Sequence, residues 1–224
     1  MAKKKESTLI NMLVALLVIA AVSGGVLGLV YGVTKDAIAE VDQKKNEAAI
    51  KAVLPLENVT YKADTMQFTY EGVNTTFPCN LAFEANGNFQ GAAVKTSEGG
   101  FGGKIDMMVG FLADGTIKGT SVLSHAETPG LGANMTGKFK DQFVDKSPNN
   151  FKLIVKKDGG DVDAITAATI TSRAFSKAVD KAYQAFMANK AQFMNNAPAK
   201  EAAPVMEAAP AEENNETEGG QSNE

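Results

Sequence analysis

The chain has 224 residues, a formal net charge of −4 and a hydrophobic content of 44%. That length fits one or two domains, and a mildly acidic chain with no basic cluster beyond its N-terminus gives no support for nucleic-acid binding. A single cysteine, Cys79, excludes an intramolecular disulfide, and one cysteine with one histidine is too few for a His/Cys metal site. Because Pro78 and Leu81 flank it, we expect Cys79 to be a buried small apolar residue rather than a reactive thiol.

The first predicted element is a single membrane-spanning helix. No charged residue occurs between positions 7 and 34, and the mostly apolar run 9–33 exceeds the roughly 20 residues that cross a bilayer. Lys3, Lys4 and Lys5 precede it, so the positive-inside rule places the N-terminus in the cytoplasm and the rest of the chain outside. A cleaved signal peptide is the alternative, but the apolar run is long for one and no clear Ala-x-Ala site follows. We therefore expect residues 1–34 to form a cytoplasmic stub and a membrane anchor.

A second helical pattern covers much of residues 35–59. Apolar side chains recur at roughly helical spacing between Ile38 and Val53, with charges between them, although Lys45 interrupts the stripe. Pro55 ends the pattern, because proline does not continue a helix. We predict an amphipathic stalk helix that leads into the folded domain.

Two β-hairpins are predicted next. Asn86-Gly87 lies between two apolar segments (81–85 and 89–94), and Asp114-Gly115 lies between two more (107–113 and 117–123). Both dipeptides tolerate the positive φ that tight hairpin turns require. The two hairpins share the pattern Gly-x-(Phe/Ile)-x-Gly-x-x-Val, at residues 87–94 and 115–122. This pattern fits either an internal duplication or two similar hairpins.

The folded domain, predicted for residues 60–196, closes with an amphipathic helix. Residues 197–224 contain seven Glu, one Lys and no aromatic residue. Such a segment cannot bury enough surface to offset its ordering entropy, so we expect a disordered acidic tail. The predicted fold class is α+β, with an antiparallel sheet and flanking helices. The apolar face of the closing helix is predicted to consist of Phe175, Val179, Ala182, Phe186 and Phe193.

The run 163–172, directly ahead of that helix, holds four hydroxyl residues and one carboxylate. Thr169, Thr171 and Ser172 fall in the predicted first turn, where free backbone N–H groups favour an anion such as a phosphate group. An ordinary helix N-cap explains a hydroxyl cluster equally well when these ten residues are considered alone.

A second group of residues follows the second hairpin. In His125-Ala-Glu-Thr-Pro-Gly-Leu-Gly132, the Pro-Gly pair predicts a tight turn in which backbone can approach a flat ligand closely. Upstream, the Gly-rich segment 99–103 predicts a flexible loop with Phe101 at its tip. Each feature alone also fits an ordinary loop, with His125 as a hydrogen-bonded turn residue and Glu127 as an exposed charge.

Taken together, these motifs resemble the FMN-binding family. The run Gly-Phe-Gly-Gly-Lys-Ile, then Asp-Gly-x-Ile-x-Gly, then His-x-Glu-Thr-Pro-Gly-Leu-Gly, and later Asp163-x-x-Thr166-Ala-Ala-Thr169, is similar to that of G subunits of Rnf electron-transport complexes over residues 5–195. The last segment resembles the flavinylation motif Asp-x-x-[Ser/Thr]-Gly-Ala-Thr. Ala167 replaces the usual glycine, and we expect alanine to lose access to positive φ there.

The resemblance implies a role for each matching residue. Thr169 would carry FMN through a phosphoester bond, and Asp163 would belong to the sequence that a magnesium-dependent flavin transferase recognises when it uses FAD and releases AMP. Thr166, Thr171 and Ser172 would hydrogen-bond the phosphate or shape its turn. The isoalloxazine pocket would be lined by Glu127, Thr128, Gly130 and Leu131.

The resemblance also implies an electron-transfer subunit of a membrane-bound, ion-translocating oxidoreductase. It would act only with the other membrane and peripheral subunits of the complex, with no catalytic residue of its own. Its single anchor would lie in the cytoplasmic (inner) membrane, with the main domain on the periplasmic side. Two alternatives remain: the C subunit of a sodium-pumping NADH:quinone reductase, and a non-enzymatic, membrane-anchored extracytoplasmic binding or sensor module.

Overall fold

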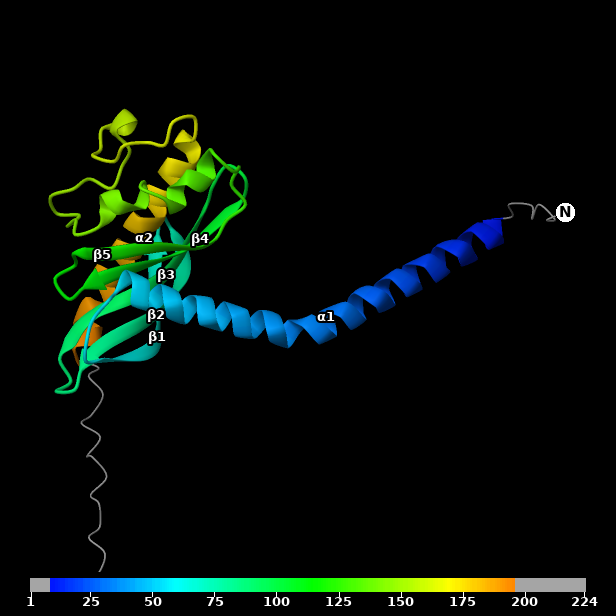
Figure 1. Ribbon diagram of the computed structural model, residues 1–224, viewed down its shortest axis with the longest axis horizontal. Coiled ribbons are helices and arrows are strands. Elements are labelled where there is room, and N and C mark those ends of the chain that lie inside the picture. The colour runs from blue at the N-terminus through cyan, green and yellow to red at the C-terminus, as the bar shows by residue number, and fades with distance from the viewer. Residues whose placement is uncertain (1–8, 196–224) are drawn as a thin grey trace, which may run out of the picture.

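The computed structural model of the chain describes residues 9–195. The three lysines ahead of the apolar run, and the acidic tail predicted for residues 197–224, lie outside the described residues. Within them, an antiparallel sheet and a C-terminal helix form a domain from which a long N-terminal helix projects (Figure 1). The predicted α+β class is confirmed.

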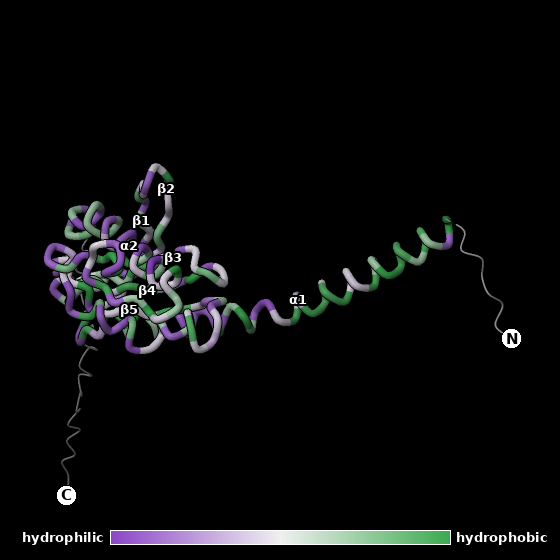
Figure 2. The backbone as a smooth tube through the Cα atoms, turned by 90° about the horizontal axis from the view of Figure 1, so that it is seen from above, coloured by the Kyte–Doolittle hydropathy of each residue, from purple (hydrophilic) through white to green (hydrophobic). Residues whose placement is uncertain are grey.

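The N-terminal helix, α1 (Leu9–Val53), is a single element of 45 residues. It is long and apolar enough to cross a membrane, and its outer half carries the apolar stretch coloured green in Figure 2. The helix continues past residue 34, where the composition changes, because no helix-breaking residue interrupts the chain there. It stops shortly before Pro55, since the residue preceding a proline is disfavoured in helical geometry. Only its last turns are buried, at Ala49 and Val53.

Five antiparallel strands form one sheet in the order of the chain: β1 (Val59–Tyr70), β2 (Val73–Glu84), β3 (Phe89–Gly99), β4 (Lys104–Leu112) and β5 (Ile117–Ser124). Both predicted hairpins are confirmed, and Gly87 (φ 88°) and Gly115 (φ 97°) take the positive φ expected of their turns. The prediction did not include β1, whose hairpin with β2 turns at Glu71 (φ 49°) and Gly72 (φ 80°).

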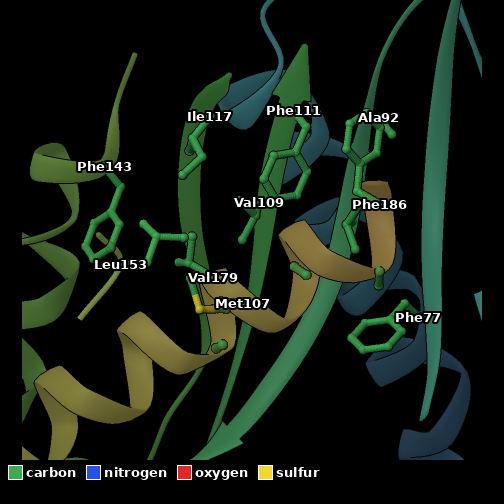
Figure 3. Close-up of a cluster of buried hydrophobic side chains, with 14 of the residues drawn as sticks. Phe77, Ala92, Met107, Val109, Phe111, Ile117, Phe143, Leu153, Val179 and Phe186 are labelled. Carbon is green, nitrogen blue, oxygen red and sulfur yellow. The ribbon is translucent and has the colours of Figure 1, made fainter. Parts of the chain in front are cut away.

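The sheet is covered by helix on both faces. Adjacent residues of a strand point to opposite faces, so Ala92 packs in one apolar cluster and Ala93 in the other. The larger cluster lies beneath α2 (Thr169–Asn195), where Phe111 stacks on Phe186 at 5.1 Å between ring centroids (Figure 3). All five predicted apolar-face residues of this helix are buried. Cys79 is 2% exposed, and burial raises the pKa of its thiol to about 12.

The smaller cluster holds the end of α1 against the other face of the sheet. Gly110 and Gly119 pair across β4 and β5 directly under Val53. A Cβ atom on Gly110 would overlap the Val53 carbonyl oxygen. These glycines therefore allow the helix backbone to approach the strands closely, and they fix the junction between the long helix and the domain.

Between β5 and α2 the chain forms three short 3₁₀ segments: η1 (Gly132–Thr136), η2 (Lys140–Phe143) and η3 (Lys156–Asp158). Phe143 of η2 is fully buried and lies 5.1 Å from Phe175 of α2, ring centroid to ring centroid. This aromatic contact fastens the irregular region to α2 and brings η1 and η3 near the helix N-terminus.

Candidate functional site

A cavity of about 380 Å³ opens at the N-terminus of α2. Three segments that are distant in sequence form it: the loop between β3 and β4, the turn after β5, and the first turn of α2 with the residues just before it. Its volume falls within the range of small-molecule sites. The cavity is lined by Phe101, Glu127, Thr128, Leu131, Gly132, Ala167, Ala168, Thr169, Ile170 and Thr171.

Ala167 forms the turn that leads into α2. Its φ is 60°, in the left-handed region that L-residues rarely adopt. Our expectation that alanine would lose access to this conformation is therefore wrong. The turn is held on both sides, because the Ala168 N–H donates to the Ile165 carbonyl at 3.0 Å and the Ser172 N–H donates to the Ala168 carbonyl at 3.0 Å. Ala167 keeps the backbone geometry of a glycine at some conformational cost.

Glu127 joins the three walls of the cavity. Its side chain is only 5% exposed. One carboxylate oxygen accepts the Gly102 N–H at 3.0 Å, and the other accepts the Thr171 hydroxyl at 2.7 Å. The His125 Nδ1 atom accepts the Glu127 N–H at 3.2 Å, so the turn after β5 is also tied to this point. Glu127 is thus a buried structural carboxylate, not an exposed charge.

Thr169 is half-buried and faces the cavity at the helix start. The Lys157 ammonium of η3 donates to its Oγ1 at 3.4 Å. The backbone N–H groups of Thr169, Ile170 and Thr171 make no hydrogen bond with any described residue. A hydroxyl beside an ammonium and unpaired N–H groups at the positive end of a helix dipole favours an anionic group at this point.

The other hydroxyls of the predicted site lie in different surroundings. Ser172 is fully buried, and its Oγ accepts the Ile165 N–H at 2.9 Å and donates to the Ala168 carbonyl at 3.0 Å, which shapes the turn. The Thr171 hydroxyl already donates a hydrogen bond to the Glu127 carboxylate. Thr166 is exposed on the turn and does not line the cavity.

The turn after β5 supplies the opposite wall. Thr128 and Leu131 line the cavity, and Leu131 is 43% exposed despite its apolar side chain. Gly130 has a φ of 75° and stands outside the lining. The Leu131 N–H donates to the Thr128 carbonyl at 3.2 Å, which closes the turn that the Pro-Gly pair predicted.

Asp163 lies on the surface, away from the cavity. Its carboxylate pairs with the Lys156 ammonium at 2.7 Å, and both groups are more than half exposed. The Gln142 side chain holds the backbone on both sides, accepting the Asp163 N–H at 2.8 Å and donating to its carbonyl at 3.1 Å. The structure therefore presents this carboxylate to solvent at a fixed place beside Thr169's turn.

Sequence reasoning did not identify Lys157 or the Gly102 N–H as part of the site, and it assigned Gly132 to a tight turn near the ligand without predicting its contact with Glu127. A Cβ atom on Gly132 would overlap the Glu127 carboxylate, and one on Gly102 would overlap the Ala126 carbonyl. These glycines allow the walls to close around Glu127. Lys157 carried no signal of its own, because one lysine in a charged loop is usually only solvated.

Comparison with known proteins gives three results. The family model for the FMN-binding domain matches residues 100–184. The G subunit of an ion-translocating oxidoreductase complex from Vibrio atlanticus is 35% identical over 182 residues, which cover 75% of this chain and 86% of the relative. The G subunit of the Na(+)-translocating ferredoxin:NAD(+) oxidoreductase complex from Acetobacterium woodii is 35% identical over 184 residues, 76% of this chain and 88% of the relative.

Among solved structures, the C subunit of the Na(+)-translocating NADH-quinone reductase from Parabacteroides distasonis is similar with a TM-score of 0.48 and 19% identity. The match covers 69% of this chain and 94% of that one. From the level and extent of identity to the two relatives above, the chain belongs to the family of G subunits of ion-translocating oxidoreductase complexes.

Proposed function

We propose that this chain is the electron-transfer subunit of an Rnf-type, membrane-bound ion-translocating oxidoreductase, and that it carries FMN as a phosphoester on Thr169. It works with the other membrane and peripheral subunits of that complex and is not a catalyst alone. The observation that carries the proposal is the cavity at the N-terminus of α2, which has the Thr169 hydroxyl on its lining. The family membership supports the same assignment.

The residues present fit a flavin nucleotide. The phosphate would meet the Lys157 ammonium and the unpaired N–H groups of Thr169, Ile170 and Thr171. A planar ring system would meet the exposed apolar side chains around the cavity, since Phe101 is 71% exposed and Leu131 43% exposed. Apolar side chains that line a cavity in this way suit contact with the face of a flat ligand.

Bound FMN supplies one-electron and two-electron transfer. The protein's own residues set its position. Thr169 would hold the phosphate end of FMN, so the attachment would not involve the ring system that exchanges electrons. The Glu127 carboxylate links the turn after β5 to the loop 99–103 and to the first turn of α2, which preserves the shape of the cavity.

The attachment requires a separate flavin transferase acting on FAD with Mg²⁺. The Thr169 oxygen would form the new bond to the phosphorus of the FMN half as the bond from that phosphorus to AMP breaks. AMP leaves and the hydroxyl proton is taken up by a base of the transferase. Asp163 is exposed and held in place, which suits recognition of this segment by a second protein.

Membrane attachment follows from α1, which is long and apolar enough to span a bilayer. We place the N-terminus in the cytoplasm and the flavin domain on the periplasmic side of the inner membrane, because three lysines precede the apolar run. Among the described residues of that run no acidic or basic side chain occurs, so ion movement is assigned to partner subunits.

Intact-mass and peptide mass spectrometry on the chain coexpressed with a flavin transferase tests the proposal. We expect an added mass equal to FMN less one water on the peptide that contains Thr169. The variant Thr169→Val should lose this mass, and the matched variant Thr136→Val, on an exposed threonine outside the cavity, should keep it. Covalent flavin retained in Thr169→Val refutes the assignment.

Asp163→Ala separates recognition from folding. We expect less flavin on Thr169 with an unchanged melting temperature, because the Asp163–Lys156 pair is exposed and contributes little to stability. A sharp fall in melting temperature would instead assign Asp163 a structural role.

A further inference from the structure

Glu127 is the only ionisable residue in the lining of the cavity at Thr169. The rest of that lining consists of apolar residues, glycine and threonines. The Glu127 side chain is 5% exposed, and within residues 9–195 it forms no ion pair. Burying a carboxylate without a cation beside it is unfavourable. The presence of a charge at this position therefore calls for an explanation.

The hydrogen bonds of Glu127 do not by themselves require a charge. Its two carboxylate oxygens accept the Gly102 N–H at 3.0 Å and the Thr171 hydroxyl at 2.7 Å, which is the acceptor pattern of an ionised carboxylate. A glutamine of the same shape could accept from Gly102 through its carbonyl and donate to Thr171 through its amide, since a hydroxyl also accepts. Linking the walls of the cavity thus needs the shape and polarity of the side chain, and the charge remains to be explained.

The nearby cations leave this charge uncompensated. Lys157 is the only cation of the described residues that hydrogen-bonds to the lining, through the Thr169 hydroxyl at 3.4 Å. In the proposed function the phosphate of FMN meets that ammonium and offsets its charge. Arg173 of α2 is held by Asp158 through two hydrogen bonds of 2.7 and 2.8 Å. Glu127 therefore contributes a net negative charge to the wall of the cavity.

A negative charge in the wall opposes the reduction of a flavin in the cavity. At mildly alkaline pH, uptake of two electrons and one proton leaves one additional negative charge on the ring system. The cavity encloses only about 380 Å³, so a ring held in it stays near Glu127, and the repulsion acts through space without a contact. At the intermediate polarity of such a site, two unit charges roughly 10 Å apart change an equilibrium about tenfold.

We propose that the Glu127 carboxylate lowers the midpoint potential of the flavin carried on Thr169, in addition to linking the walls of the cavity. The inference rests on the proposed function, because it requires FMN in this cavity. Charges that a protein places near the ring are one of its means of tuning a flavin. A lower potential makes the reduced flavin a stronger electron donor to the next carrier of the complex.

Glu127→Gln in the flavinylated full chain tests the inference. The chain is coexpressed with a flavin transferase, purified in detergent and titrated at an electrode at mildly alkaline pH while the flavin absorption is recorded. We expect the midpoint potential to rise by about 30 mV, which is a tenfold change for a two-electron couple. The melting temperature should stay near the native value, because glutamine can form both hydrogen bonds.

Two further variants separate charge from shape. Glu57→Gln removes an exposed carboxylate outside the cavity, where water and salt screen its charge, and should leave the potential unchanged. Glu127→Asp keeps the charge, so its potential should stay below that of Glu127→Gln, although the shorter side chain lowers the melting temperature.

The outcomes distinguish this inference from the proposed function. A potential that is unchanged or lower in Glu127→Gln overturns the inference alone, since peptide mass spectrometry still finds FMN on Thr169. Loss of FMN from Glu127→Gln but not from the native chain means that the carboxylate holds the flavin instead of tuning it, which also overturns the inference. Absence of FMN on Thr169 in the native chain overturns both.

Discussion

Ala167→Gly should stabilise the domain. The native residue holds a φ of 60°, and the left-handed conformation costs an L-residue about 1–2 kcal/mol. Glycine removes that cost but adds flexibility to the unfolded chain, which costs about 0.4–1 kcal/mol. The difference leaves a net gain of about 0.5–1 kcal/mol in the free energy of unfolding.

The buried thiol of Cys79 provides the assay. It is the only cysteine of the chain and is 2% exposed, so a thiol reagent modifies it only when the domain opens. When closing is fast relative to the thiol reaction, the labelling rate is proportional to the population of the open state. A gain of about 0.5–1 kcal/mol in the free energy of unfolding then slows labelling by about two- to fivefold. The protein can be studied in detergent at full length, because the signal comes from the core of the sheet and not from α1.

Ala188→Gly is the matched control. Ala188 is an exposed residue inside α2, where glycine destabilises a helix by about 1 kcal/mol relative to alanine. The same substitution should therefore speed labelling about fivefold at position 188 and slow it at position 167. Faster labelling of Ala167→Gly than of the native protein would refute the view that this turn is strained.

Three further outcomes are expected. Gly110→Ala should displace the end of α1, because the added Cβ overlaps the Val53 carbonyl oxygen. The free energy that holds the helix end on the sheet should fall by about 1–3 kcal/mol, which should appear as faster trypsin cleavage near the end of α1. Unchanged cleavage would contradict the close packing. Glu127→Ala should lower the free energy of unfolding by about 2 kcal/mol, measured by Cys79 labelling, with Glu127→Gln losing less; an equal loss would show that the charge, and not the side-chain shape, matters. The hydrogen bonds from Arg173 lower the pKa of Asp158 below its usual 3.8, so their contribution to stability is complete above about pH 4 and disappears as the pH falls through the lowered pKa. When the free energy of unfolding is measured by urea denaturation between about pH 5 and pH 2.5, it should fall less in Asp158→Asn than in the native protein. An equal fall in both proteins would show that the pair has no such effect.

The sequence predicted those elements that have strong local signals. Asn86-Gly87 and Asp114-Gly115 mark tight turns by their own backbone preferences, and the hairpins follow from them. β1 was missed because its side chains are mostly polar or half-exposed, with Met66 alone fully buried, so no apolar alternation stands out. Its turn at Glu71-Gly72 requires a positive φ from a glutamate, which no turn rule favours.

The site was predicted as a set of segments, not as a set of contacts. The motif around Thr169 and the turn after β5 were both identified, and the structure brings Thr128, Leu131 and Thr169 to one cavity. The partners of Glu127 could not be predicted, because Gly102 and Thr171 are 25 and 44 residues away from it in sequence. Nor could the sequence show that Ala167 adopts a glycine-like conformation, since the hydrogen bonds that hold the turn exist only in the folded protein.

Because α1 is one helix from Leu9 to Val53, it connects the apolar segment to the folded domain without a flexible linker. Residues 34–53 span about 30 Å at 1.5 Å per residue, which sets how far the domain stands from the bilayer when the helix is upright. Because Val53 is packed against Gly110 and Gly119, each residue inserted into this segment would raise the domain by about 1.5 Å and turn it by about 100°. An insertion of about seven residues would nearly restore its facing while adding about 10 Å of height. Seven-residue insertions would therefore change the height of the domain with little change in its orientation, which separates the effect of distance from that of orientation.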